Sequence, residues 1–177
     1  MKIKCTVIFV FTAIFLLTAF TACQKKPVPE ESLPLRSGNF ETTANISYKE
    51  LKATAAITRE TPKSCIVVFT SPESIKDMAF VYSEGNVDLS YKGMSFSFDP
   101  DSLPGRAIAN IAIAGINKAM EADGFSLDYT GNALVLTGVM ESGEFTMRLD
   151  KESGNLIKLS VPAEDLEIEF VNFSFLD

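Results

Sequence analysis

The chain has no histidine and no tryptophan, and only three of its 177 residues are cysteines. Histidine is the commonest general base near neutral pH and a frequent ligand of transition metals, so its absence removes the usual residues of hydrolases and metalloenzymes. The cysteines stand at positions 5, 23 and 65. We expect the first two to be removed or modified, which leaves no disulfide to form. We therefore expect no cofactor, no metal and no catalytic activity.

Basic side chains are also few, with 16 Lys and Arg against 23 Asp and Glu. Lys2 and Lys4 belong to a leader described below, so 14 basic side chains remain in the mature chain and its formal net charge is −9. Nucleic-acid binding needs a basic surface that neutralises phosphates. The charge balance therefore argues against nucleic acid as a partner.

An uncharged apolar run, CTVIFVFTAIFLLTAFTA, occupies residues 5–22 after the two lysines. A basic start, an apolar stretch and small residues at its end are typical of a secretory signal peptide. The run closes in Phe20-Thr21-Ala22-Cys23, which resembles a bacterial lipobox with Phe20 in place of the usual leucine. This resemblance implies cleavage before Cys23 and a lipid on its thiol. An uncleaved span and a plain secretory signal are the alternatives.

We thus expect a signal peptide over residues 1–22, the lipidated Cys23 with a tether over 23–38, and one domain over 39–177. The tether, QKKPVPEESLPLRSG, is polar and contains three prolines, which favours an extended linker. The membrane is then a partner through the lipid anchor. We expect the outer side of the cytoplasmic membrane, or the outer membrane in a two-membrane host, because Gln24 is not the Asp of the retention signal.

From Asn39 onward, apolar and polar residues alternate with a period of two, in about ten or eleven short segments. Turn sequences separate them: SEGN at 83–86, YKGM at 91–94, TGN at 130–132, ESGE at 141–144 and ESGN at 152–155. Such strands form an antiparallel sheet with one dry face. A long one-sided sheet must curl to hide that face, so we predict a mainly β (α+β) fold, a strongly curved antiparallel half-barrel.

One segment, RAIANIAIAGINKAMEADG at 106–124, has helical spacing instead. Ser102 is a suitable helix cap, and Gly124 a suitable stop. The apolar side chains cover an arc of roughly 200°, with Asn110 and Asn117 opposite, whereas a surface helix needs about 100°. We therefore expect one long helix on the concave face, with apolar walls on more than one side.

The order of these segments resembles the LolA/LolB-type carriers and the LppX-type lipoproteins. The resemblance rests on six strands from NFETTANISY to SFSFDP, a helix, and five strands ending EIEFVNFSFLD, and on the stretch SPESIKDMAFVYSEGNVDLSYKGMSFSF at 71–98. It implies non-catalytic binding of a lipid or acyl chain in the concave face, or the recruitment of an envelope protein partner. The chain lacks a convincing helix before the first strand, which these carriers have.

A cavity for a hydrophobic ligand would be lined by apolar side chains from the inward rows of the sheet and from the helix. The residues that we predict for it are Phe69, Phe80, Tyr82, Tyr91, Phe96, Phe98, Ile108, Ile116 and Met120. The alternative is that the helix fills the half-barrel as its core, leaving a protein-interaction module.

Three other features have simpler explanations. Cys65 lies in SCIVVFT, where we expect a small buried hydrophobe rather than a nucleophile. Arg59 has inward parity, and we expect its side chain to bend to solvent rather than to meet a lipid headgroup. The acidic pairs are explained by turns and by the wet face of the sheet rather than by acid/base catalysis; they are Asp99 and Asp101, Glu164 and Asp165, and Glu167 and Glu169.

Overall fold

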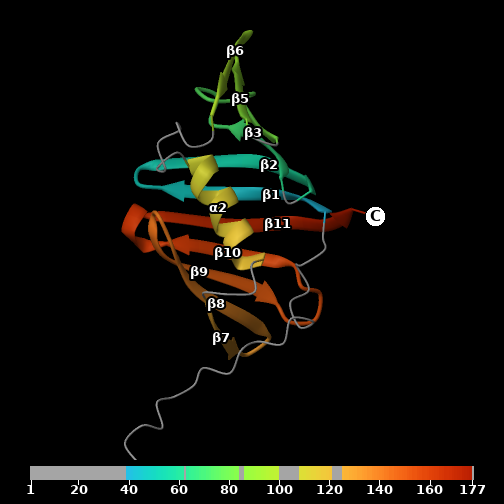
Figure 1. Cartoon of the computed structure of the whole chain (residues 1–177), viewed down its shortest axis with the longest axis vertical. Helices are drawn as coiled ribbons and strands as arrows, with labels where there is room; N and C mark the ends of the chain where they lie inside the picture. The colour runs from blue at the N-terminus through green and yellow to red at the C-terminus, as the bar shows by residue number, and fades with distance from the viewer. Residues whose placement is uncertain (1–38, 62, 84–85, 100–107, 121–124, 177) are drawn as a thin grey trace, which may run out of the picture.

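The computed structural model describes residues 39–61, 63–83, 86–99, 108–120 and 125–176. The predictions made for residues 1–38 lie outside that part. Eleven strands form one open antiparallel sheet in the order β6-β5-β4-β3-β2-β1-β11-β10-β9-β8-β7. The sheet is curved, and helix α2 (Ile108–Met120) lies across its concave face (Figure 1). The predicted half-barrel with one long helix is confirmed.

The first and last strands lie side by side in the middle of the sheet, and the two halves of the sheet extend from this pair (Figure 1). The chain therefore builds one half outward to the β6 edge, passes through α2, and builds the other half from the β7 edge back to β1. The strands are β1 Asn39–Tyr48, β2 Leu51–Thr61, β3 Ser64–Ser71, β4 Ala79–Ser83, β5 Asn86–Tyr91, β6 Met94–Phe98, β7 Phe125–Thr130, β8 Ala133–Met140, β9 Gly143–Asp150, β10 Leu156–Val161 and β11 Leu166–Leu176, with a short 3₁₀ helix, η4, at Pro162–Glu164.

The turn residues lie where the sequence signals predicted them. Lys92 and Gly93 link β5 to β6 with φ of 49° and 78°, the left-handed values that a two-residue hairpin turn of type I′ requires. A similar left-handed residue, Lys49 with φ 52°, links β1 to β2. This turn explains why the apolar residues stand at even positions in β1 and at odd positions in β2.

The dry face of the sheet packs with α2 into one core. In β1, Phe40, Ala44 and Ile46 are buried while Glu41 and Asn45 are exposed, as the period of two predicts. The core also takes in buried side chains of β2, β3, β8, β9, β10, β11 and α2. The helix therefore joins both halves of the sheet rather than covering one of them.

Candidate functional site

Helix α2 fills the middle of the concave face. Its residues Ile111 and Ile116 are no more than 1 % exposed. At Gly115 the helix approaches β10 so closely that a Cβ atom would lie 2.9 Å from Leu159 Cδ2, which is shorter than a van der Waals contact. Side chains of the protein itself therefore occupy the concave face at this point.

A second set of contacts joins α2 to the other half of the sheet, and these contacts are polar. The Tyr82 hydroxyl on β4 donates a hydrogen bond to Asn110 Oδ1. Arg59 Nη2 on β2 donates one to Asn117 Oδ1 at 3.4 Å. The two asparagines are two helical turns apart and share one side of the helix. The side of the helix opposite its apolar arc, which carries these two asparagines, therefore also contacts the sheet.

Arg59 is buried, with 3 % of its surface exposed. The prediction that it bends to solvent is therefore wrong. The physical reason is its register: Arg59 pairs with Phe40 on one side and Cys65 on the other, in an inward row where Asn117 offers an acceptor. Removal from water lowers the pKa of the guanidinium, and the neighbouring Cys65 acts in the opposite sense.

Cys65 is a free thiol, 4 % exposed, which confirms the prediction of a small buried hydrophobe. Burial raises the pKa of this thiol to about 12, and the charge of Arg59 opposes that rise only in part. Burial also raises the pKa of the adjacent Tyr82 hydroxyl, with a further contribution from Cys65. A thiol that keeps its proton at physiological pH is a poor nucleophile, so this cluster packs rather than reacts.

Apolar surface remains accessible beyond the helix, on the concave side of β4 to β6. In one row across these strands Phe80 pairs with Leu89, and Leu89 with Phe96. Phe96 is 49 % exposed and Met94 53 %, whereas the side chains nearer the helix are partly buried. We call this surface the aromatic wing, and its residues are Phe80, Tyr82, Leu89, Met94, Phe96 and Phe98.

The structure brings several of the predicted cavity residues together in this wing. Phe69 packs edge to face on Phe80 at its inner margin, with ring centroids 6.4 Å apart. Phe96 and Phe98 stack with their centroids at 6.4 Å near the outer margin. Leu89 was missing from the predicted set, although its place in the period-two pattern puts it between Phe80 and Phe96.

Tyr91 lies on the same face, paired with Met94, and its hydroxyl donates to a backbone oxygen in the link between β3 and β4. The other predicted residues lie elsewhere. Ile116 belongs to the closed core between the helix and the sheet, and Ile108 is partly buried against that core. The side chain of Met120 and the whole of Cys23 lie outside the described residues.

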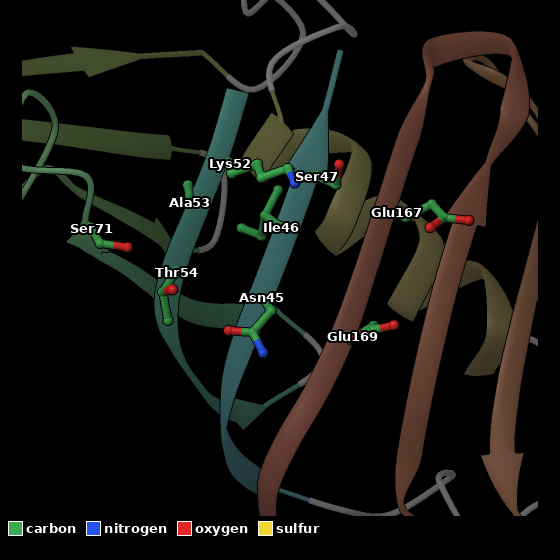
Figure 2. A pocket seen from close by; sticks show the side chains of 9 residues that line it. All are labelled: Asn45, Ile46, Ser47, Lys52, Ala53, Thr54, Ser71, Glu167 and Glu169. Atoms are coloured by element: carbon green, nitrogen blue, oxygen red, sulfur yellow. The ribbon is translucent and has the colours of Figure 1, made fainter. Parts of the chain in front are cut away.

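A second candidate is a polar depression of 360 Å³ on the outer face of β1, β2 and β11, on the side away from the helix (Figure 2). Asn45, Lys52, Glu167 and Glu169 contribute to its lining. Glu167 Oε2 forms an ion pair with Lys158 Nζ at 3.0 Å, and both glutamates are exposed. These side chains can form hydrogen bonds with solvent or a ligand. Acid/base catalysis needs two carboxyl groups in different environments, whereas Glu167 and Glu169 are both exposed on one face of β11.

The other acidic pairs show no catalytic arrangement in the described part of the chain. Asp99 is exposed in the loop after β6, and Asp101 lies outside the described residues. Glu164 is 9 % exposed in η4, while Asp165 caps that turn with φ 50°. No group of acidic or cysteine side chains in the described ranges is arranged to hold a metal ion. Of the described helices, none is long and apolar enough to cross a bilayer.

The chain matches no protein-family model and no curated protein. Among solved structures it is similar to an uncharacterized conserved protein from Thermus thermophilus, with a TM-score of 0.57 and 11 % identity over 84 % of this chain and 85 % of that one. Its structural neighbours include LolA superfamily proteins. One is NE2245 from Nitrosomonas europaea, with a TM-score of 0.40, 13 % identity, and 84 % and 90 % of the two chains covered. The complex of the CwlD amidase with the GerS lipoprotein from Clostridioides difficile also contains a similar chain, with a TM-score of 0.44, 12 % identity, and 70 % and 76 % covered. At these identities the similarity concerns the fold alone.

Proposed function

We propose that this protein is a lipid-anchored, non-catalytic binding protein of the cell envelope, which holds an acyl chain or a similar apolar ligand against the aromatic wing. One observation carries the proposal. The concave face is closed under α2 but continues as accessible aromatic surface over β4 to β6, where Phe96 is 49 % exposed. Apolar ligands bind where such side chains can be covered.

The wing is an accessible apolar surface rather than a buried cavity. Phe80 packs on Phe69 where the wing meets the core, and Phe96 lies exposed on the edge strand β6. The bond from Tyr82 to Asn110 marks its boundary with the helix. A flexible apolar chain lying along this surface would cover the exposed rings without any movement of the closed core.

Native mass spectrometry tests the proposal. Residues 24–177, exported with an ordinary cleavable leader and purified without detergent, should carry a lipid-sized adduct that an organic extract releases. Phe96→Asp should lose the adduct because it places a charge in the wing. Ser95→Asp is the matched control, since Ser95 is the exposed neighbour on the opposite face of the same strand. Bare protein masses with an empty extract would overturn the proposal.

A protein-interaction module is the second candidate, and the closed contact of Gly115 with Leu159 favours it. A half-barrel whose centre is filled can still use its outer strand, and β6 is an edge strand whose sequence, MSFSF, carries no charge. Exposed edges of this kind accept a strand from another protein. An envelope protein that co-purifies with the Phe96→Asp variant after the lipid adduct is lost would favour this candidate.

A further inference from the structure

The end of β11 carries an apolar tip on both of its faces. Phe175 pairs with the inward-facing Phe40, and Phe173 stacks on Phe40 with ring centroids 4.8 Å apart, so these two rings lie on the concave side. Val171 precedes a register shift in this strand and pairs with the outward-facing Thr43, and Leu176 pairs with Asn39, so both lie on the outer side. Val171, Phe175 and Leu176 are each 37 % exposed.

This tip extends beyond its neighbour on one side. The pairing of β11 with β10 reaches only to Glu169, so the described residues after Phe170 pair with β1 alone. Figure 1 shows the C-terminal end of β11 projecting past β10. A ligand lying on the concave face would cover Phe175 but would leave Leu176 in water. An occupant that covers both faces must surround the strand end.

The chain upstream of the structure joins it at this tip, because Asn39 pairs with Leu176. Cys23 lies 16 residues before Asn39, and an extended chain of that length spans at most about 55 Å. An anchored domain therefore stays within that distance of the bilayer, and the high effective concentration lets a small apolar patch engage the lipid. This step rests on the lipid anchor of the proposed function.

We propose that the apolar tip (Phe173, Phe175, Leu176) dips into the bilayer to which the protein is anchored. Charges of both signs lie at this end of the sheet, with Glu60 near the end of β2, Lys63 in the turn after it, and Lys151 and Glu152 in the turn between β9 and β10. Contact with lipid is thus apolar in origin and does not depend on anionic headgroups. Phe98, in the wing, lies in the row of strand pairs that also contains Phe175, but the buried side chains of Phe40, Arg59 and Val87 separate the two.

The absence of tryptophan makes the test direct, because one introduced indole is a unique reporter. Phe175→Trp and Leu176→Trp report on the two faces of the tip. Val139→Trp is the control, since Val139 is 64 % exposed near the opposite end of β8. The lipidated full chains are reconstituted into zwitterionic phosphatidylcholine vesicles with brominated acyl chains. Both tip reporters should shift their emission to shorter wavelength and lose intensity, while the control should do neither.

The other outcomes each refute the inference and have different meanings. Protein that floats with the vesicles while its tip reporters stay unquenched is anchored without tip contact, so the proposed function survives and the inference does not. Protein that fails to float, with unquenched reporters, overturns both. Blue-shifted emission of the tip reporters without vesicles would mean that the tether covers the tip, or that a second copy of the chain covers it when the shift depends on protein concentration. Quenching of the Phe175→Trp reporter alone, with Leu176→Trp unquenched, would mean that lipid binds only on the concave face and that the tip does not enter the bilayer.

Discussion

Replacing Gly115 by alanine places one methyl group at the closest approach of α2 to the sheet. The three nearest atoms to that methyl all belong to Leu159: Cδ2 at 2.9 Å, Cδ1 at 3.1 Å and Cγ at 3.6 Å. Leu159 is fully buried in β10, so its side chain has little room to retreat. The substitution therefore sets a gain in helix propensity against overpacking at one identified contact.

The two effects have opposite signs and known sizes. Alanine in place of glycine inside a helix stabilises by about 1 kcal/mol. Overpacking a closed core costs about 1 to 3 kcal/mol. We expect Gly115→Ala to lower the free energy of unfolding by about 1 kcal/mol, which is a fall of roughly 3 °C in Tm for a domain of this size.

Removing the opposing side chain should reverse the sign. Leu159→Ala alone should cost about 2 to 5 kcal/mol because it leaves a cavity. In that background the new methyl meets none of the three atoms, so Gly115→Ala should now stabilise by about 1 kcal/mol, a coupling of about 2 kcal/mol. Urea unfolding followed by circular dichroism measures all four proteins. Equal stabilisation by Gly115→Ala in both backgrounds would refute the close contact of helix and sheet.

Three further predictions concern other parts of the chain. The Cys65 thiol should resist disulfide reagents in the folded protein and react in denaturant. A fast reaction of the folded protein would contradict the burial. Because the pKa of this thiol is raised to about 12, the folded state holds the proton more tightly than the unfolded state does, so the free energy of unfolding should fall by up to about 1.4 kcal/mol per pH unit above about pH 8.5. Cys65→Ala should remove that part of the slope. Tyr82→Phe should cost about 1 kcal/mol in urea unfolding through its bond to Asn110, whereas Tyr129→Phe, on a side chain 57 % exposed, should cost nothing measurable, and equal effects would contradict the bond. Cys23→Ala, exported behind an ordinary cleavable leader, should leave the protein out of the membrane fraction in flotation, and retention would show that the lipid is not the only anchor.

The strands and the helix could be predicted from the sequence because each obeys a local period. Even positions of β1 and odd positions of β2 carry the apolar residues, and the turn at Lys49 explains the change. The position of α2 on the sheet could not be predicted in the same way. It depends on which residue of β10 lies under Gly115, and that follows from the register of distant strands.

The buried polar contacts show the same limit. Arg59 at a strand end and Asn117 on a helix both look solvent-exposed when each is considered within its own element. They meet because the pairing of β2 with β3 and the crossing of α2 place them opposite each other across the concave face. A hydrogen bond between residues 58 positions apart leaves no trace in either local pattern.

The position of α2 decides where on the concave face a ligand can bind. A helix held by Leu159 on one side and by Tyr82 and Arg59 on the other is attached to both halves of the sheet, so it cannot swing aside without breaking contacts on at least one of them. Opening the middle of the half-barrel would also expose side chains that are now fully buried, at a cost of about 25 cal/mol for each Å² of apolar surface. Covering the wing needs no such opening, because Phe96 and Met94 are already accessible. Binding at the wing with the helix in place is therefore the less costly route for an apolar ligand.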